Sequence, residues 1–362
     1  MTKEWLFDID IVGGCNLRCP SCPVGNSDYS SQPQGFMSPD LLEQIVKKAV
    51  RECGLPVIGL YNWTEPFLHP RLPEMIRRVN KYGVQCGIST NLNVMRNLDE
   101  VLVAEPRYIR ISVSGFTQDV YGRHHKRGNI EKVKANMIAM AEAKKRLGSS
   151  TTLKIIYHRY LNNHDDEASM REFAKKYGFG FDVVWAFMMP AEKNIAIARD
   201  GLASPEITDE DRELLARLAL PLDRALEIGR EYVDSPCLLQ TSRVSITHEG
   251  KVMLCCSVFD QSRFQIGDYL ELPLDEIQRR RMAHSYCAEC SAAGVHALSS
   301  YLPGPEFDRI ALANVHEHFP NVQMTGVLGK RKKKSIVSRT GAVIRDFGRR
   351  LRKTYARIRN AR

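Results

Sequence analysis

The sequence lacks a long hydrophobic run. No stretch of about eighteen consecutive apolar residues occurs, so a membrane-spanning helix is not expected. The first residues, MTKEWLFDIDI, turn acidic before any apolar stretch of signal-peptide length, so no export signal is expected either. We therefore expect a cytoplasmic protein. The ten cysteines of such a chain are first candidates for metal ligands or reactive thiols, rather than for disulfides.

An excess of positive charge is absent from most of the chain, although the net formal charge is +10. Residues 330–362 contain fourteen Lys or Arg and one acid, Asp346, and thus carry +13. Subtracting this from +10 leaves −3 for residues 1–329. A mildly acidic body argues against a catalytic domain built around nucleic acid, so no specific nucleic-acid partner is expected.

The basic tail has an apolar stripe. Its large apolar residues recur at spacings of three and four, with Lys and Arg between them: Ile344, Phe347, Leu351, Tyr355 and Ile358. This pattern is typical of helices that lie on anionic membranes and, less often, of RNA-binding arms. A solvated or disordered arm without a ligand is the alternative. We predict that residues 330–362 promote salt-sensitive, peripheral association with an anionic membrane surface.

Strand and helix patterns alternate through the first half of the chain. Strands are expected at residues 5–12, 57–62, 84–90, 108–114, 152–158 and 181–187, and helices at 38–53, 73–83, 130–148 and 167–178. The repeat of about thirty residues is typical of a parallel sheet with crossover helices, and therefore of the α/β class. Periodicity does not distinguish an open sheet from one that curls into a barrel.

The second half of the chain changes character twice. Residues 191–235 are mostly helical and charged, which indicates a connector. From residue 236, alternating residues on either side of His248-Glu249-Gly250 indicate a β-hairpin, and a short helix then leads to a cysteine pair. Proline and glycine in YLPGPE indicate the end of this second unit near residue 300. The predicted divisions are 1–190, 191–235, 236–300 and 301–362.

Three cysteines, Cys15, Cys19 and Cys22, lie in the loop GGCNLRCPSCPVGN directly after the first predicted strand. A structural zinc site needs four ligands, and no nearby Cys or His completes this one. A redox pair of Cys19 and Cys22 would leave Cys15 without a purpose. Three thiolates can instead hold three corners of a [4Fe–4S] cluster and leave the fourth iron open for a small ligand.

The CxxxCxxC spacing after a first strand resembles that of the radical S-adenosylmethionine (radical SAM) superfamily, over roughly residues 5–190. The resemblance implies a partial (β/α)6 TIM-like barrel and a cluster whose open iron binds the amino and carboxylate groups of SAM. It implies reductive cleavage of SAM to a 5′-deoxyadenosyl radical, which abstracts hydrogen from a substrate. It also implies an electron donor such as flavodoxin or ferredoxin.

The family's Gly-Gly-Glu-Pro motif is matched only in part. Glu65 in NWTEP resembles the acid that accepts a hydrogen bond from the SAM ammonium group, although Trp63 and Thr64 replace the glycines. The aromatic residue that usually precedes the third cysteine is absent, because Ser21 stands there. Either backbone groups hold the adenine, or another side chain such as Phe36 fills the space.

Two further sets of polar residues follow predicted strands. Ser89 and Asn91, in STN at the end of the third strand, resemble the ribose-contacting position of the family. Ser112, with Arg123 eleven residues later, resembles the Ser…Arg pair that holds the SAM carboxylate. The resemblance therefore implies that these four residues contact SAM.

A second cysteine set follows the predicted hairpin and comprises Cys237, Cys255, Cys287 and Cys290. From the residues alone, four thiols could hold zinc or an iron–sulfur cluster. The segment resembles the start of the SPASM domain, and its four cysteines match the shortened, single-cluster version called Twitch. That resemblance implies an auxiliary [4Fe–4S] cluster in a small C-terminal domain.

Three functions remain open. The first is a radical SAM oxidoreductase that dehydrogenates or otherwise modifies a sugar- or cyclitol-type metabolite, with the auxiliary cluster accepting the second electron. The second is a maturase that modifies a peptide or protein, and the third is a non-catalytic Fe–S or zinc interaction protein with a basic arm. Candidates for the base that removes a substrate proton are His158, Arg159, His124 and His125, all near predicted strand ends.

Overall fold

The computed structural model describes residues 5–28 and 32–327. The chain divides into two compact units, Met1–Val327 and Leu328–Arg362. The predicted membrane-binding segment, residues 330–362, lies outside the described residues. Within the described ranges, none of the helices combines the length and the apolar character that crossing a bilayer requires.

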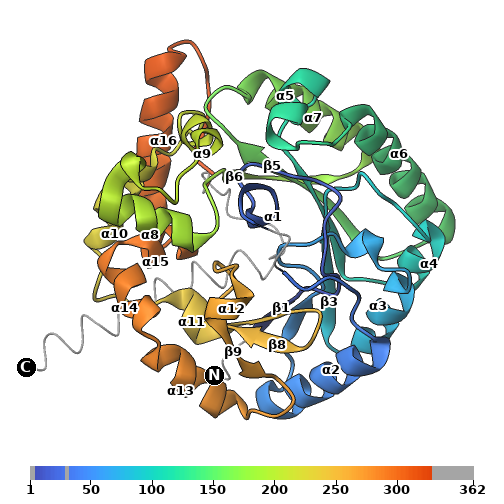
Figure 1. The fold of residues 1–362 in the computed structure, drawn as a ribbon. Coiled ribbons are helices and arrows are strands. Elements are labelled where there is room, and N and C mark those ends of the chain that lie inside the picture. Colours follow the sequence, from blue (N-terminus) through green and yellow to red (C-terminus); the bar gives the residue numbers. More distant parts are fainter. Residues whose placement is uncertain (1–4, 29–31, 328–362) are drawn as a thin grey trace, which may run out of the picture. The chain divides into compact units, whose positions relative to one another are not determined.

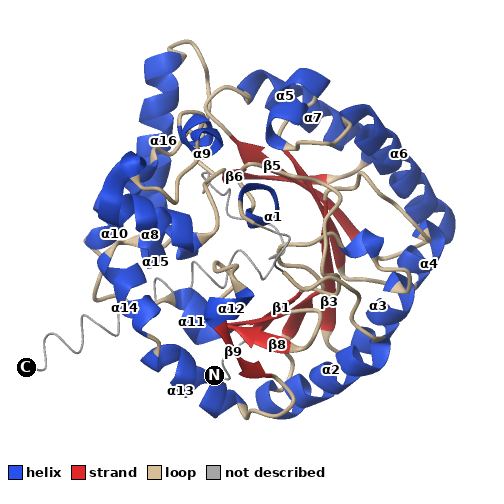
Figure 2. Ribbon diagram, viewed as in Figure 1, coloured by secondary structure: helices blue, strands red, loops and turns tan. Residues whose placement is uncertain are grey.

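One curved sheet runs through the first unit, in the strand order β6-β5-β4-β3-β2-β1-β7-β8-β9 (Figures 1 and 2). Its strands are β1 (Leu6–Ile9), β2 (Val57–Gly59), β3 (Gln85–Thr90), β4 (Tyr108–Val113), β5 (Thr152–Arg159), β6 (Gly180–Trp185), β7 (Arg243–Ile246), β8 (Lys251–Met253) and β9 (Gln265–Asp268). The strands from β6 to β7 in this order are parallel to their neighbours, and β8 and β9 are antiparallel. The predicted partial barrel of the α/β class is confirmed.

Helices cover the outer face of the parallel strands (Figure 1). Those of the strand–helix repeats are α2 (Pro39–Cys53), α3 (Leu72–Asn80), α4 (Leu98–Val103), α5 (Gln118–His124), α6 (Ile130–Leu147) and α7 (His164–Tyr177). The later helices are α8 (Ala191–Asp200), α9 (Asp209–Leu215), α10 (Leu222–Arg230), α11 (Leu238–Ser242), α12 (Gln261–Phe264), α13 (Leu274–Ala283), α14 (Ser285–Ala292), α15 (Val295–Ser300) and α16 (Gly304–His318). The four-residue helix α1 (Pro23–Asn26) instead lies near the centre of the view.

Local signals explain why the predicted elements form where they do. Helix α2 begins where Ser38 Oγ accepts a hydrogen bond from the Leu41 N–H at 3.1 Å, followed by Pro39 in the first turn. In β4 the burial alternates: Ile109 and Ile111 are fully buried, whereas Arg110 between them is less buried on the opposite face. Because side chains alternate along a strand, apolar residues face the helices and polar ones face the interior of the barrel.

The sheet continues from the barrel into the cysteine-bearing hairpin. Strand β7 pairs with β1 in parallel, with Leu6 opposite Arg243 and Ile9 opposite Ile246. The predicted hairpin forms between β7 and β8, and Gly250 takes a φ of 82° in its turn, a conformation that favours glycine. The second cysteine set is thus attached to the same sheet as the first.

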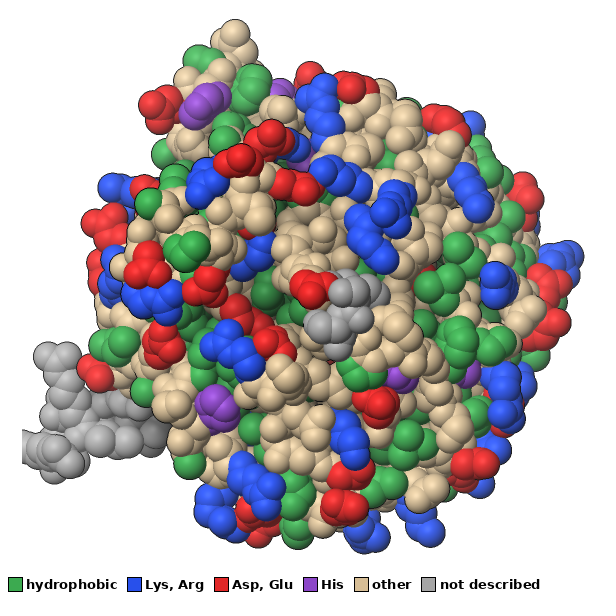
Figure 3. Space-filling view, viewed as in Figure 1, with side chains coloured by type: hydrophobic (Ala, Val, Ile, Leu, Met, Phe, Trp, Pro, Cys, Tyr) green, Lys and Arg blue, Asp and Glu red, His purple; other side chains and the backbone are tan. Residues whose placement is uncertain are grey.

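A second apolar cluster extends the ordered fold beyond residue 300. Trp185, at the end of β6, is buried with Phe307, Ala311 and Val315 of α16. Residues 301–327, which the sequence indicated as the start of an extension, therefore include a packed helix. On the face shown in Figure 3, acidic and basic side chains are interspersed around the periphery.

Candidate active site

The three-cysteine loop begins just beyond β1, at the carboxyl end of the parallel strands. Gly13 donates its N–H to the Gly35 carbonyl at 2.8 Å. A Cβ at Gly13 would lie 2.7 Å from both the His248 ring and the Pro33 carbonyl, so no larger residue fits without movement. Active sites of parallel α/β folds are built at this end of the strands, from loops of this kind.

Helix α1 closes the loop behind its last cysteine. Cys22 occupies the N-cap position, and its carbonyl accepts the Asn26 N–H at 3.1 Å. A Cβ at Gly25 would lie 2.2 Å from the Cys19 carbonyl, so only glycine allows the helix to approach the loop backbone. The Asn26 side chain then donates to the carbonyls of Pro20 and Met189, both at 2.7 Å, which ties the loop to the segment after β6.

The three thiols of the loop lie near one another. Burial raises the pKa of Cys19 well above its ordinary value, and Cys22 and Cys15 raise it further. Burial likewise raises the pKa of Cys15 and of Cys22 to about 12. Free thiols are therefore protonated here, and ionisation of all three requires a bound cation to compensate the charge.

The chemistry of this donor set fits an iron–sulfur cluster. The Leu17 N–H donates to Cys15 Sγ at 3.5 Å, and the Asn91 amide donates to the same sulfur at 3.6 Å. In residues 5–28 and 32–327, no group of three His, Cys, Asp or Glu side chains is arranged to hold one metal ion. Thiolate sulfurs are the ligands that hold iron–sulfur clusters, so these three residues could hold three irons of one cluster.

Glu65 is the buried acid nearest to this loop, with only 2% of its surface exposed. Its Oε1 accepts hydrogen bonds from the Thr90 hydroxyl at 2.7 Å and the Phe67 N–H at 3.0 Å, and its Oε2 accepts the Asn91 N–H at 2.8 Å. The Glu65 N–H itself donates to the Gly14 carbonyl at 3.1 Å. Burial raises the pKa of Glu65 and these hydrogen bonds lower it. Burial has the larger effect, so the pKa is raised to about 7.

Asp10 explains how NWTEP keeps this geometry without the family's glycines. Asp10 Oδ1 accepts the N–H groups of Asn62, Trp63 and Thr64 at 2.9, 3.1 and 3.0 Å. It also accepts the Thr64 hydroxyl at 2.6 Å. One carboxylate thus fixes three successive residues of the loop. Asp10 was not among the predicted site residues. Its place at the end of the first predicted strand, three residues before Gly13, could have indicated a role at this site.

Asn91 joins the acid to the cysteines, and its predicted contact with the SAM ribose stays a prediction. Its main chain donates to Glu65, and its side chain donates to Cys15 Sγ and, at 3.0 Å, to Asn16 Oδ1. Ser89 lies two residues earlier, opposite Arg110 of β4 in the sheet register, and is half-buried on the interior face. Asn91 and Glu65 are therefore brought to the cysteine loop directly, and Ser89 lies further along the same strand.

The Ser112 and Arg123 side chains are placed differently from one another. Ser112 lies on the interior face of β4, whereas Arg123 lies on the exposed side of α5 and pairs with Asp119 of its own helix. A second Ser…basic pair with the same eleven-residue spacing is in direct contact: Ser114 Oγ lies 3.0 Å from His125 Nε2. The assignment of Ser112 and Arg123 to the SAM carboxylate stays a prediction.

His125 lies beside the cysteine loop. Its Nδ1 is 3.7 Å from Cys19 Sγ, and its ring stacks on Tyr121 with the ring centroids 4.5 Å apart. Burial lowers its pKa well below the usual range, so the ring is neutral. Sequence reasoning proposed His125 only as a proton acceptor, and contact with a cysteine was not anticipated.

The aromatic ring next to Ser21 comes from Tyr160. The Tyr160 hydroxyl donates to Ser21 Oγ at 3.1 Å, and His124 stacks on its ring with centroids 3.6 Å apart. Phe36, which we considered for this place, is 56% exposed and packs edge-on against His69. Tyr160 is therefore the better placed of the two rings to lie near the residue before the third cysteine.

The two candidate bases of β5 point in opposite directions. Arg159 is buried on the helix side, where Nε and Nη2 donate to the Glu167 carboxylate at 2.6 and 2.8 Å. His158 lies on the interior face with Arg110, and burial lowers its pKa to about 4. His158 is thus a neutral side chain facing the barrel interior, and Arg159 is engaged in an ion pair.

The four thiols of the second set are also brought together, from three separate segments. Cys237 caps α11, Cys255 follows β8, and Cys287 and Cys290 lie three residues apart on α14, which places them on one face. Burial raises the pKa of Cys255, and Cys237 and Cys290 raise it further. The pKa of Cys290 is raised by burial and then by Cys237 and Cys287. The four side chains thus form one electrostatically coupled group.

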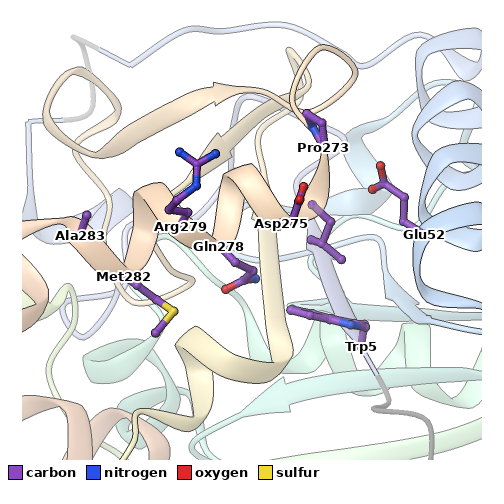
Figure 4. A pocket seen from close by; sticks show the side chains of 9 residues that line it. Trp5, Glu52, Pro273, Asp275, Gln278, Arg279, Met282 and Ala283 are labelled. Atoms are coloured by element: carbon purple, nitrogen blue, oxygen red, sulfur yellow. The ribbon is translucent and has the colours of Figure 1, made fainter.

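A groove lies at the other end of the barrel, before β1. It has a volume of about 920 Å3 and is lined by Trp5 and by residues of α13, including Met282 (Figure 4). Trp5 precedes β1, whereas the cysteine loop follows it, so this groove is remote from the candidate site. A much smaller cavity of about 50 Å3 reaches Gly13, Trp63 and His248 beside the cysteine loop.

Comparison with known proteins supports the resemblance of the first half of the chain to the radical SAM superfamily. The family model of the radical SAM superfamily matches residues 9–173. A relative from Pyrococcus furiosus, a tungsten-containing aldehyde ferredoxin oxidoreductase cofactor-modifying protein, is 33% identical over 112 residues. That match covers 31% of this chain and 30% of the relative, so the chain spans under a third of that protein's length.

Solved structures with the same fold are distant in sequence. A structure of anSMEcpe with bound AdoMet aligns with a TM-score of 0.53 at 14% identity, over 88% of this chain and 100% of that one. SuiB from Streptococcus suis, bound to S-adenosylmethionine, aligns with a TM-score of 0.51 at 11% identity, over 75% of this chain and 65% of that one. These likenesses concern the fold. The family match shows that residues 9–173 are similar to the radical SAM superfamily domain.

Proposed function

We propose that this protein is a radical SAM oxidoreductase with an auxiliary iron–sulfur centre. The observation that carries the proposal is the convergence of Cys15, Cys19 and Cys22 with Glu65 and Asn91 at the carboxyl ends of β1, β2 and β3. A [4Fe–4S] cluster with SAM, when bound there, supplies a 5′-deoxyadenosyl radical that takes a hydrogen atom from the substrate. The neighbouring structures that carry AdoMet support the same ligand.

Within this proposal, the chain's own residues bind and orient SAM. The Glu65 carboxylate can accept a hydrogen bond from the SAM ammonium group, because Oε2 accepts one hydrogen bond, from the Asn91 N–H, among the residues that the structure describes. Asn91 and Asp10 fix the two loops that flank this acid. Their hydrogen bonds hold the acid in place before the ligand arrives, which lowers the entropic cost of binding.

The second thiol set supports an auxiliary cluster. Cys237, Cys255, Cys287 and Cys290 supply four sulfur ligands, which suits zinc or a cluster by donor type. We favour a [4Fe–4S] cluster over zinc because the segment resembles the single-cluster Twitch domain. Such a cluster supplies an acceptor for one electron. The adjacency of β1 and β7 attaches both centres to one sheet.

The reaction we propose is dehydrogenation of a carbon that bears a hydroxyl group, in a sugar- or cyclitol-type metabolite. Loss of a hydrogen atom, an electron and a proton converts the alcohol to a ketone. The proton needs an acceptor on the interior face of the barrel, and His158 is the candidate that faces this side. A flavodoxin or ferredoxin is the proposed source of the external electron.

A peptide or protein substrate is the second candidate. It is favoured by one comparison: SuiB bound to its precursor peptide SuiA aligns with a TM-score of 0.52 over 81% of this chain, at 12% identity. Modification of a cofactor is suggested by the name of the Pyrococcus relative, over its shared 112 residues. Reactions on all three substrate classes would use the same radical chemistry, and they differ in the molecule that binds inside the barrel.

Anaerobic reconstitution of the full chain tests the proposal. We expect two clusters, about eight irons per chain, and formation of 5′-deoxyadenosine from SAM. Replacing Cys15, Cys19 and Cys22 by Ala should remove roughly half of the iron and all SAM cleavage. Continued 5′-deoxyadenosine formation by this triple variant would falsify the proposal. Mass spectrometry of cell extracts for products lighter by two hydrogens then distinguishes a metabolite from a peptide.

A further inference from the structure

Three consecutive arginines, residues 279–281, lie near the carboxyl end of helix α13, and one of them is buried. Arg279 and Arg280 are exposed and both form ion pairs with Glu276, one or more turns earlier on the same helix. Arg281 has no exposed surface at all. A guanidinium keeps its charge at every physiological pH, so Arg281 brings a permanent positive charge into the interior.

Arg281 is satisfied by hydrogen bonds, but no carboxylate balances its charge. Its Nε donates to the Leu254 carbonyl at 2.7 Å, Nη1 to the Arg243 carbonyl at 2.7 Å, and Nη2 to the Leu239 carbonyl at 3.2 Å. In the described part of the chain, no acidic side chain forms an ion pair with it. A buried charge without a counter-charge is destabilising, even when its hydrogen bonds are made.

The carbonyls that hold the Arg281 guanidinium belong to the segments that carry the second cysteine set. Two of the carbonyls that it binds belong to Leu254, directly before Cys255, and Leu239, two residues after Cys237. Its own carbonyl accepts the Cys287 thiol at 3.6 Å. Burial lowers the pKa of Arg281, and the nearby Cys255, Cys256, Cys237 and Cys287 raise it. The guanidinium therefore lies where these cysteines converge.

We propose that Arg281 is the built-in counter-charge of a metal–thiolate centre held by Cys237, Cys255, Cys287 and Cys290. Four thiolates around a core of charge about two plus leave an excess of negative charge, whether the core is a [4Fe–4S] cluster or zinc. The guanidinium compensates that excess only when metal is bound. Without metal the thiols are neutral, and the positive charge is left uncompensated. The inference rests on the proposed auxiliary centre, and it concerns a positioning and charge-balancing residue, not a catalytic one.

This arrangement predicts that one substitution affects the metal-loaded protein more than the metal-free protein. Arg281→Met keeps much of the side-chain volume and removes the charge. In the full chain, we expect it to lose most metal at the second set, so that total iron falls by about half, and any retained cluster to have a lower reduction potential. In both states the substitution leaves three carbonyls without a donor, so we expect it to lower the unfolding temperature less in the metal-free, reduced protein than in the metal-loaded one. A purely structural arginine would lower it equally in both.

Two further variants complete the experiment. Arg281→Lys keeps the charge and should retain more metal than Arg281→Met, even though it cannot reach all three carbonyls. Arg280→Met is the matched control, because Arg280 directly precedes Arg281 but is exposed and paired with Glu276. It should leave the iron content and the reduction potential unchanged. Iron, zinc and sulfide analysis, together with redox titration followed by electron paramagnetic resonance, provides the readouts.

The outcomes separate this inference from the proposed function. If the second set holds iron and Arg281→Met changes neither iron content nor potential, the counter-charge role is overturned and the proposed function stands. An equal loss of unfolding temperature in the metal-free and metal-loaded Arg281→Met proteins also overturns it. If the second set instead binds stoichiometric zinc, and Arg281→Met loses that zinc, the counter-charge role of Arg281 is upheld. The electron-acceptor role of the second set is then ruled out. Absence of any metal at the second set removes both.

Discussion

Asn91 donates its main-chain N–H to Glu65 Oε2 at 2.8 Å, across the ends of β3 and the loop after β2. The same residue reaches Cys15 Sγ with its side chain, at 3.6 Å. The acid that is proposed to bind the SAM ammonium group and the cysteine that is proposed to bind iron are therefore positioned by one residue. Substitution of Glu65 should therefore lower the affinity for SAM more than it lowers the iron content.

Glu65→Gln should weaken SAM binding roughly ten- to a hundredfold, because a charge-assisted hydrogen bond contributes about 1.5–3 kcal/mol. Equilibrium dialysis of SAM with reconstituted protein measures this, with iron content as a check on assembly. Thr90→Val is the control, since it removes one hydrogen bond to Glu65 and leaves the carboxylate in place. Equal losses in both variants would show that loop geometry, and not the charge, determines the affinity.

The pH dependence of SAM binding should follow Glu65. Burial raises the pKa of this acid to about 7, so it is largely protonated at pH 6 and largely ionised at pH 8. Because the ammonium group binds the carboxylate, SAM affinity should rise with pH over this interval and the slope should vanish in Glu65→Gln. The stability of the SAM-free protein should change in the opposite sense. The raised pKa stabilises the fold below the acid's ordinary pKa, and this contribution is lost as pH rises through about 7.

His125 should tune the cluster held by the first cysteine set. A thiolate bound to iron can only accept a hydrogen bond, so Nδ1 must carry the proton toward Cys19, and Nε2 must accept the Ser114 hydroxyl. Hydrogen bonds to cluster sulfurs stabilise the reduced state. His125→Phe, which preserves stacking on Tyr121, should therefore lower the reduction potential, and Ser114→Ala should lower it less.

The matched control for His125 is its neighbour. His124 is equally buried and stacks on Tyr160, so His124→Phe should leave the potential unchanged. Redox titration without SAM gives the decisive value. A shift that appears only when SAM is present would mean that His125 acts on SAM and not on the Cys19 sulfur, which would contradict this prediction.

The basic tail gives a prediction that can be tested on vesicles. Near an anionic bilayer each Lys or Arg contributes about 1 kcal/mol, and salt screens the attraction. The full chain should therefore sediment with anionic liposomes at low salt and remain in solution at high salt. A chain shortened to residues 1–329 should not sediment in either case. Equal sedimentation of both chains would contradict a role for residues 330–362.

The sequence allowed the local elements to be predicted closely, because their signals are local. Helix α2 was expected to end at Cys53 and does so, since Ser38 and Pro39 start it and Gly54 follows it. The pairing of β1 with β7 joins residues more than 230 positions apart and has no local signal. It depends on how the connector folds back, which periodicity does not report.

The candidate site was predictable where spacing alone determines chemistry. The three cysteines, Glu65 and Asn91 are brought together as expected. Arg123 and His125 illustrate the limit. They are two residues apart, yet one lies on the exposed face of α5 and the other follows the end of that helix, against the cysteine loop. Which of them turns inward depends on the helix end and its packing, and the sequence alone did not indicate this.

The β1–β7 pairing also constrains how the protein can be divided. A fragment that ends near residue 190 would turn β1 into an edge strand with an unpaired row of main-chain groups beside Phe7 and Ile9. Asp8, which is only 3% exposed, would lose the Arg243 guanidinium that lies 3.1 Å away. Such an edge is a template for pairing between chains. The N-terminal half should thus aggregate when produced alone, and both halves should unfold in a single cooperative transition.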